Sequence, residues 1–403
     1  MRRLLQQEGV SVILAWIAVI VVLGLTFWAT IAGAIGWILL GVGLGVILLV
    51  PPIAHRNPST MVPWPLATIA ALPFIVGVIT PPGSLGDATA YITVAAIGLL
   101  VVIELDSFTP VTMNRGFAIA FVVFTTMTVA GVWELSRWTL DLVYGTTLVE
   151  DNDALMHRLI AATGVGLVAG IVVDRYLARI REERIPAGIG PEDAEEQVDA
   201  AGEAVSRVLA TVGISEEREE QIVRAFQGVL LVILTIGLAT LNIDVVFSAT
   251  VGLLATLLPG IFERNYQFRV DGALTIWIAV AVVFHALGTV WFYQTVWGWH
   301  NIAHATTGSL VAGVGYTLLR TLEVHTTAVS FPPKFTLFFV VIFVFAVGVV
   351  WEIFEFTLDQ VAVAITGEEM LLTQHGLQDT MTDLVANTVG AIVVAVAATV
   401  YRI

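Results

Sequence analysis

The sequence predicts an all-α membrane protein with about twelve transmembrane helices, arranged as two parallel six-helix repeats. The chain is 57% hydrophobic and 13% charged, with a mean hydropathy of +0.90, whereas about a quarter of the residues of a soluble globular protein are charged. Apolar runs near the length needed to cross a bilayer recur throughout the chain, and two of its segments resemble each other. Composition and run length predict the class, and the resemblance between segments predicts the repeat.

The repeat is visible in two pairs of segments. Residues 131–141 (GVWELSRWTLD) match residues 349–359 (VVWEIFEFTLD), and residues 153–164 match residues 379–390 further along each half. An internal repeat of this kind indicates that a chain is built from two related units.

Each half has room for six spans of the length that a bilayer requires. The first set is expected near 10–31, 33–53, 64–80, 87–104, 116–144 and 153–176, and the second near 225–241, 244–262, 272–292, 300–320, 335–361 and 379–401. The corresponding domains are 1–176 as a first repeat, 177–224 as an acidic cytoplasmic linker and 225–403 as a second repeat.

The placement of basic residues predicts the orientation. If the N-terminus with Arg2 and Arg3 is cytoplasmic, nearly all other Arg and Lys residues fall on the same side, with only Arg137 and Arg158 near the outer face. The outer loops contain none; they lie near 81–86, 145–152, 293–299 and 362–378. This follows the positive-inside rule and predicts a multi-pass protein of the cell membrane with both termini cytoplasmic. An even number of spans per half gives both halves one orientation.

Charge and cysteine content exclude several classes of function. The chain has no cysteine, a net charge of −15 and a single lysine, Lys334, so disulfides and thiolate metal sites are excluded. The acidic balance argues against nucleic acid as a partner and leaves the lipid bilayer as the expected one. Few lysines and many carboxylates suit a high-salt cytoplasm.

Ionisable residues gather at one level of the second half. Glu352, Glu355 and Asp359 are spaced i, i+3 and i+7, so they share a helix face, and Asp379 and Asp383 are spaced i, i+4. The predicted topology brings these residues to the extracytoplasmic half of the membrane. The candidate metal ligands are His285, His304, Glu352, Glu355, Asp359, Asp379 and Asp383. Asn387, one turn after Asp383, and Gln374, in the loop before the last helix, are candidate supporting residues.

Such a group is costly in lipid, so it indicates a functional site. Five neighbouring carboxylates cannot all stay charged, so either some are protonated or cations neutralise them. Two imidazoles with several carboxylates could hold a divalent ion such as Zn, Mn, Fe, Mg or Ca, and the residue types leave its identity open. The structural alternative is a set of hydrogen bonds between helices that fixes their packing.

Three motifs resemble those of a known group. They are His300-Asn-Ile-Ala-His304, Trp351-Glu-Ile-Phe-Glu355, and Asp379-Thr-Met-Thr-Asp383 with Asn387, Gly390 and Ala391. The second half resembles the YjdF-like integral membrane proteins, a group without a settled activity. It is more distantly similar to the VanZ-like proteins, from which it departs at Glu355, where glutamine is expected, and at Asn301, where a charged pair often sits.

The first half carries an altered version of the same pattern. Glu134, Asp141 and Asp153 keep their acids, but Arg137, His157 and Ala161 replace Glu355, Asp383 and Asn387. Arg137 could pair with Glu134 or Asp141 to give a neutralised structural cluster. We therefore expect any chemistry in the second half.

Three functions remain open. The first is a metal-dependent enzyme acting on a lipid-linked or small polar extracytoplasmic substrate, with Glu352 or Asp383 as general base. The second is a proton- or cation-coupled transporter, which two parallel halves would suit, although the polar residues gather on one side of the membrane only. The third is a noncatalytic membrane assembly or sensing protein.

Overall fold

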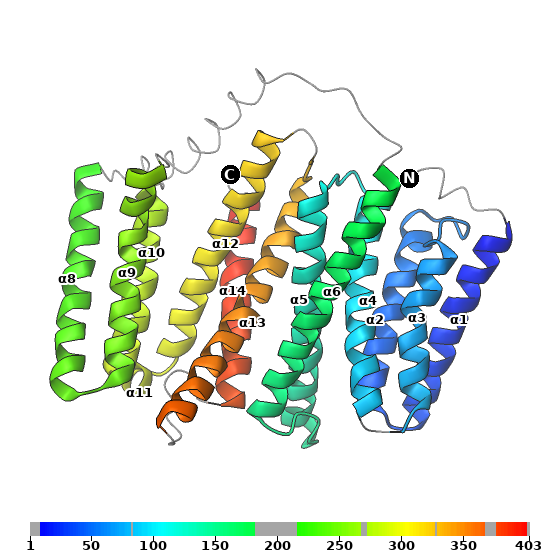
Figure 1. Cartoon of the computed structure of the whole chain (residues 1–403), viewed down its shortest axis with the longest axis horizontal. Coiled ribbons are helices and arrows are strands. Elements are labelled where there is room, and N and C mark those ends of the chain that lie inside the picture. The colour runs from blue at the N-terminus through cyan, green and yellow to red at the C-terminus, as the bar shows by residue number, and fades with distance from the viewer. Residues whose placement is uncertain are drawn as a thin grey trace. The chain divides into compact units, whose positions relative to one another are not determined.

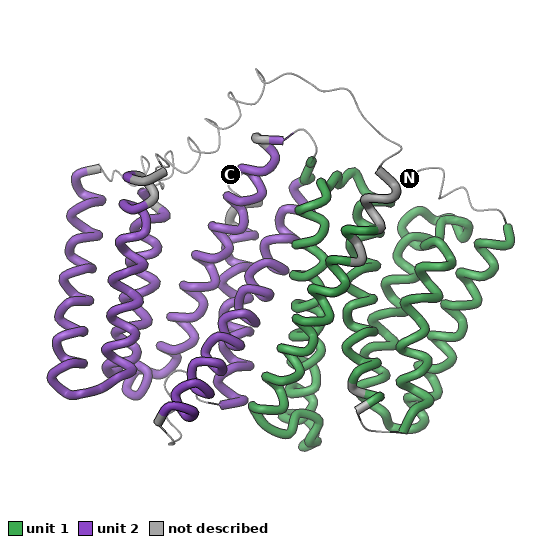
Figure 2. The backbone as a smooth tube through the Cα atoms, viewed as in Figure 1, with its two compact units in different colours: residues 1–187, 328–332 green, residues 188–327, 333–403 purple. Residues whose placement is uncertain are grey.

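The computed structural model describes residues 9–81, 84–181, 216–266, 272–326, 329–366 and 376–400. The chain forms two compact units, each considered by itself (Figure 2). Unit 1 comprises Met1–Ala187 with Ala328–Pro332, and unit 2 comprises Gly188–Thr327 with Pro333–Ile403. The long elements of both units are helices (Figure 1), as the apolar runs predict.

The described part of unit 1 contains six long helices. They are α1 (Gly9–Ile31), α2 (Ile35–Ala54), α3 (Trp64–Ile79), α4 (Ser84–Phe108), α5 (Arg115–Tyr144) and α6 (Asn152–Arg181). α4 packs against α2, α3, α5 and α6, and α5 packs along α6.

Local sequence sets both ends of α5. The side chain of Asn114 accepts a 2.8 Å hydrogen bond from the backbone N–H of Phe117, so one of the free N–H groups of the first turn is satisfied. At the other end Gly145 adopts φ +67°, and its N–H bonds to the carbonyl of Asp141. Glycine takes this left-handed conformation without a steric penalty, which fixes where the loop toward α6 begins.

Unit 2 also contains six long helices among its described residues. They are α8 (Glu216–Thr240), α9 (Ile243–Tyr266), α10 (Gly272–Leu287), α12 (Trp299–His325), α13 (Pro333–Thr366) and α14 (Leu377–Val400). α10 continues through a π-helical turn, η1 (Gly288–Phe292), into the short α11 (Tyr293–Thr295).

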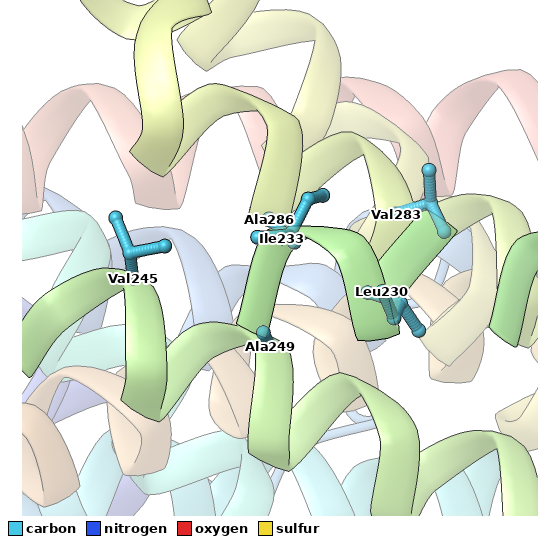
Figure 3. Close-up of a cluster of buried hydrophobic side chains, with 6 residues drawn as sticks. All are labelled: Leu230, Ile233, Val245, Ala249, Val283 and Ala286. Carbon is cyan, nitrogen blue, oxygen red and sulfur yellow. The ribbon is translucent and has the colours of Figure 1, made fainter. Parts of the chain in front are cut away.

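Apolar packing fixes the rotation of α10. Val283 and Ala286 lie on its face toward α8 and α9, where they meet Leu230, Val245 and other apolar side chains (Figure 3). Residues three apart share one helix face, so His285 points away from this core. It turns toward α12, against which α10 also packs.

Glycines allow α12 and α14 to cross closely. A Cβ added at Gly390 would lie 2.0 Å from the carbonyl oxygen of Ala305, and one at Gly308 would lie 2.3 Å from that of Asn387. Such small residues let helix backbones approach within a membrane. α13 packs against both helices, and the crossing places the first turns of α12 beside the first turns of α14.

Ten of the described helices are long and apolar enough to cross a membrane. The two other predicted spans differ for separate reasons. α3 is apolar but only 16 residues long. α12 has ample length, but its N-terminal half carries His300, Asn301 and His304, which lower its hydropathy. Its contacts with α10, α13 and α14 bury His304 and half-bury His300, while Asn301 remains exposed. The two-repeat arrangement stays a prediction.

Candidate metal centre

The π-helical turn brings Tyr293 back to His285. Each residue of an α-helix turns the chain by about 100° about the helix axis, so residues eight apart would point in directions roughly 80° apart. A π turn accommodates one extra residue, which reduces this difference in direction to about 20°. The Tyr293 hydroxyl lies 2.7 Å from His285 Nδ1, within hydrogen-bonding distance. A Cβ at Gly288 would lie 2.2 Å from the Tyr293 ring. The ring therefore folds back over a position that only glycine can occupy.

The rings of His285, Tyr293, His300 and His304 form a closed cycle of contacts. On α12, His300 and His304 are one helical turn apart, and their ring centroids lie 4.5 Å apart. His304 faces His285 at 6.0 Å, and His300 faces Tyr293 at 4.8 Å. The rings of each adjacent pair meet edge to face at 73–77°. Each ring therefore restricts the orientation of its two neighbours.

Two aspartates of α14 face this cycle of rings. His300 Nε2 lies 3.4 Å from Asp383 Oδ1, and His304 Nε2 lies 3.5 Å from Asp383 Oδ2. On its other side, His300 Nδ1 lies 3.6 Å from Asp379 Oδ1. The ligand atoms of His300, His304 and Asp383 all lie within 4.8 Å of one another, so these three residues could hold a metal ion.

Donor spacing and donor chemistry both suit a small divalent ion. With bonds of about 2.1 Å, neighbouring ligands of a tetrahedral zinc ion are roughly 3.4 Å apart, and one ligand atom from each of the three residues lies within 4.8 Å of the other two. Asp383 is 2% exposed, and its Oδ1 makes no hydrogen bond within the described part of the chain. A buried carboxylate oxygen is normally satisfied, and a cation between it and the imidazoles would do so. Asp379 would hold His300 from behind, as carboxylates do for metal-bound histidines.

The acids of α13 lie beside the triad. Glu352, Glu355 and Asp359 are buried, with exposed fractions of 1%, 7% and 8%. Gly348 of α13 lies beside Leu384 and Asn387 of α14, so Glu352, one turn after Gly348, lies near the level of Asp383, one turn before Asn387. The shared face predicted from the i, i+3 and i+7 spacing therefore points into unit 2.

The four helices that carry this cluster have no Arg or Lys residue close to it. α10, α12, α13 and α14 carry only Arg320 and Lys334. Arg320 is 16 residues from His304 and Lys334 is 18 residues from Glu352, which places each about 24–27 Å away along its helix. Charge compensation from these four helices is therefore left to the imidazoles and to bound protons or cations.

In unit 1, arginine side chains compensate the charge of the buried acid. Glu134 is 1% exposed, and both of its oxygens lie 3.0 Å from Arg137 Nη1, while Arg158 Nη1 lies 3.4 Å from Oε2. Asp141 instead accepts hydrogen bonds from Thr146 and from the backbone of the loop after α5. Of the two partners expected for Arg137, Glu134 is the one it binds, and Arg158 adds a second cation.

The structure places the predicted site residues differently. His304 and Asp383 belong to the candidate metal-binding triad with His300, Asp379 lies beside His300 and is partly exposed, and Glu352, Glu355 and Asp359 are buried on α13. His285 bonds to Tyr293 and lies next to the triad. Asn387 is 7% exposed at the crossing of α12 and α14, and Gln374 lies outside the described residues.

The structure adds two residues to the site that the sequence did not single out: His300 as a candidate ligand and Tyr293 as a neighbour of the ligands. The i, i+4 spacing of His300 and His304 was visible in the sequence and places both on one face of α12. Tyr293 had no comparable signal, because regular α-helical spacing from His285 would turn it away and nothing in the sequence announces the π turn.

The comparisons with known proteins agree with the membrane class. Residues 222–403 match a family described as "Predicted membrane protein (DUF2238)", and residues 1–61 match a "Domain of unknown function (DUF8268)". No curated protein and no solved structure matches the chain. The matched descriptions name neither the YjdF-like nor the VanZ-like group. Over its second half, the chain is therefore similar to a family of predicted membrane proteins, and that half contains the candidate metal centre.

Proposed function

We propose that unit 2 is a membrane-embedded, metal-dependent enzyme that acts on a polar group of a lipid-linked or extracytoplasmic substrate. The observation that supports this most strongly is the triad of His300, His304 and Asp383, with ligand atoms within 4.8 Å of one another. Three protein ligands with a fourth position for water or substrate are typical of catalytic zinc sites.

The surrounding acids supply the remaining roles of a hydrolytic reaction. A divalent ion at the triad would polarise the bond under attack and make bound water more acidic. Glu352 is buried on α13, which packs against α14, and we assign it as the general base that would take a proton from the attacking water. It then returns that proton to the leaving group, which balances the reaction. Asp383 would serve as a ligand, and Asp379 would orient His300.

Metal content tests the proposal directly. Elemental analysis of purified protein should find about one divalent ion per chain, and His304→Ala or Asp383→Ala should remove it because each deletes a ligand. His157→Ala is the matched control, since His157 is exposed on unit 1 and occupies the repeat position of Asp383. Wild-type protein that stays metal-free after incubation with zinc, manganese and iron would overturn the proposal.

A cation- or proton-coupled transporter is the second candidate. The supporting observation is the row of buried acids along α13, Glu352, Glu355 and Asp359, which could bind ions in succession. Reconstituted vesicles separate the two functions. Ion or proton flux abolished by Glu355→Gln would favour transport, whereas metal-dependent conversion of a lipid-linked substrate, abolished by Glu352→Gln without any flux, would favour the enzyme.

A further inference from the structure

The π turn in α10 is an irregularity that the triad alone does not explain. A π turn opens the regular helical hydrogen bonding, and such turns are often found at functional sites. Side chains satisfy two carbonyls next to it. The Thr289 hydroxyl donates to the carbonyl of His285 at 3.1 Å, and the Trp299 indole N–H donates to that of Phe284 at 3.0 Å. The turn is therefore held by specific bonds.

One of these bonds also ties the turn to the metal ligands. Trp299 is the first residue of α12 and directly precedes His300. Its ring packs on Phe284 of α10 and on Phe292 of the π turn, with centroids 5.2 Å and 4.6 Å away. The π turn and the first turn of α12 are thus fixed to each other beside the triad.

Tyr293 has two separate contacts from this position. Its ring lies edge to face with His300 at 4.8 Å, and its hydroxyl lies 2.7 Å from His285 Nδ1. A neutral phenol is a good hydrogen-bond donor. If it donates to Nδ1, neutral His285 carries its own proton on Nε2, and neither nitrogen is then free to bind a metal.

We propose that the π turn is a positioning device for the metal centre, in which the Tyr293 ring orients His300 as a ligand and the Tyr293 hydroxyl holds His285 as a non-ligating hydrogen-bond donor. This inference rests on the proposed metal-binding function. Tyr293 and His285 are positioning residues, and Gly288 is required because the ring occupies the space of its missing side chain.

Variants of Gly288 and Tyr293 separate the roles of ring and hydroxyl. Gly288→Ala would push the ring away, since its Cβ would lie 2.2 Å from that ring. Tyr293→Phe removes only the hydroxyl, and Tyr293→Leu removes the ring without adding bulk to the π turn. Gly228→Ala is the control, because a Cβ at this helical glycine of unit 2 meets nothing within 4 Å.

The first measurement is the affinity for Co²⁺, titrated by its visible absorption. Gly288→Ala and Tyr293→Leu should each weaken binding about 10- to 100-fold, the usual effect of losing a group that orients a ligand. Tyr293→Phe should change the affinity by a few-fold at most, and Gly228→Ala should leave it unchanged. Wild-type affinity in a folded Gly288→Ala or Tyr293→Leu variant would overturn the inference.

The second measurement does not depend on metal. In protein labelled with ¹⁵N-histidine, the signal of a hydrogen-bonded Nδ1, assigned to His285 by its loss in His285→Ala, should disappear in Tyr293→Phe and Gly288→Ala. It should persist in Gly228→Ala. If the wild type binds no cobalt, the proposed metal-binding function fails, and with it the role of the ring in orienting a ligand. The nitrogen signal then tests only whether the π turn holds His285: persistence in Gly288→Ala refutes that part of the inference, and loss supports it.

Discussion

A buried glutamate occupies the same motif position in each unit, and its surroundings differ. Glu134 follows Trp133 on α5, and Glu352 follows Trp351 on α13; both are 1% exposed. Glu134 contacts two arginines, whereas Glu352 lies on a helix face shared with Glu355 and Asp359, with Arg and Lys remote along the four helices of the site. Because a buried charge needs a partner, the first arrangement is a closed structural cluster and the second is suited to binding a cation.

The arginine cluster should therefore matter for stability. Glu134→Gln leaves Arg137 and Arg158 without their shared counter-charge, so we expect the free energy of unfolding to fall by about 3 kcal/mol, as for other broken buried ion pairs. Denaturant unfolding in detergent measures this. The control is Glu220→Gln, because its 2.7 Å pair with Arg224 is exposed and should contribute less than about 1 kcal/mol. Equal losses in both variants would contradict the assignment.

At the scale of elements, α12 combines a polar beginning with a close crossing. His300 and His304 precede the glycine that meets α14, so the same backbone approach that buries α12 brings both imidazoles to Asp383. The distance between α12 and α14 at their crossing therefore also determines the geometry of the triad.

Widening this crossing should disturb the metal centre. Gly390→Ala would place a methyl group 2.0 Å from a backbone carbonyl of α12, which a rotamer change cannot relieve. We expect a stability loss of about 1–3 kcal/mol, typical of overpacking, together with weaker metal binding. Thermal unfolding and metal titration report the two effects. Gly164→Ala, where a Cβ meets nothing within 4 Å, should change neither, and an unaffected Gly390→Ala protein would count against the close crossing.

At the scale of the whole molecule, the distribution of basic residues predicts the sidedness of the membrane protein. Ser59 lies in the loop between α2 and α3, and Thr147 lies in the loop between α5 and α6. The positive-inside rule places the first loop, with Arg56, in the cytoplasm and the second outside. Within unit 2, the same rule places Arg320 and Lys334 toward the cytoplasm and the first turns of α12 and α14 toward the outer side.

Cysteine labelling tests this orientation cleanly, because the natural chain has no cysteine. In intact cells, an impermeant thiol reagent should label Thr147→Cys, while Ser59→Cys should react only after permeabilisation. Both positions are exposed, so differences in reactivity report sidedness rather than burial. Labelling of Ser59→Cys in intact cells would reverse the predicted topology of unit 1.

The sequence by itself determined the helical membrane class, helix positions close to those observed and the acidic face of α13, because apolar run length and residue spacing are local properties. Tertiary structure alone decided which imidazoles meet Asp383, that α10, α13 and α14 pack around the polar helix α12, and that Tyr293 reaches His285. These depend on helix rotation, on how closely two backbones cross and on one π turn. The first two are fixed by packing between helices and the third by a local π turn, so hydropathy and regular α-helical spacing do not specify them.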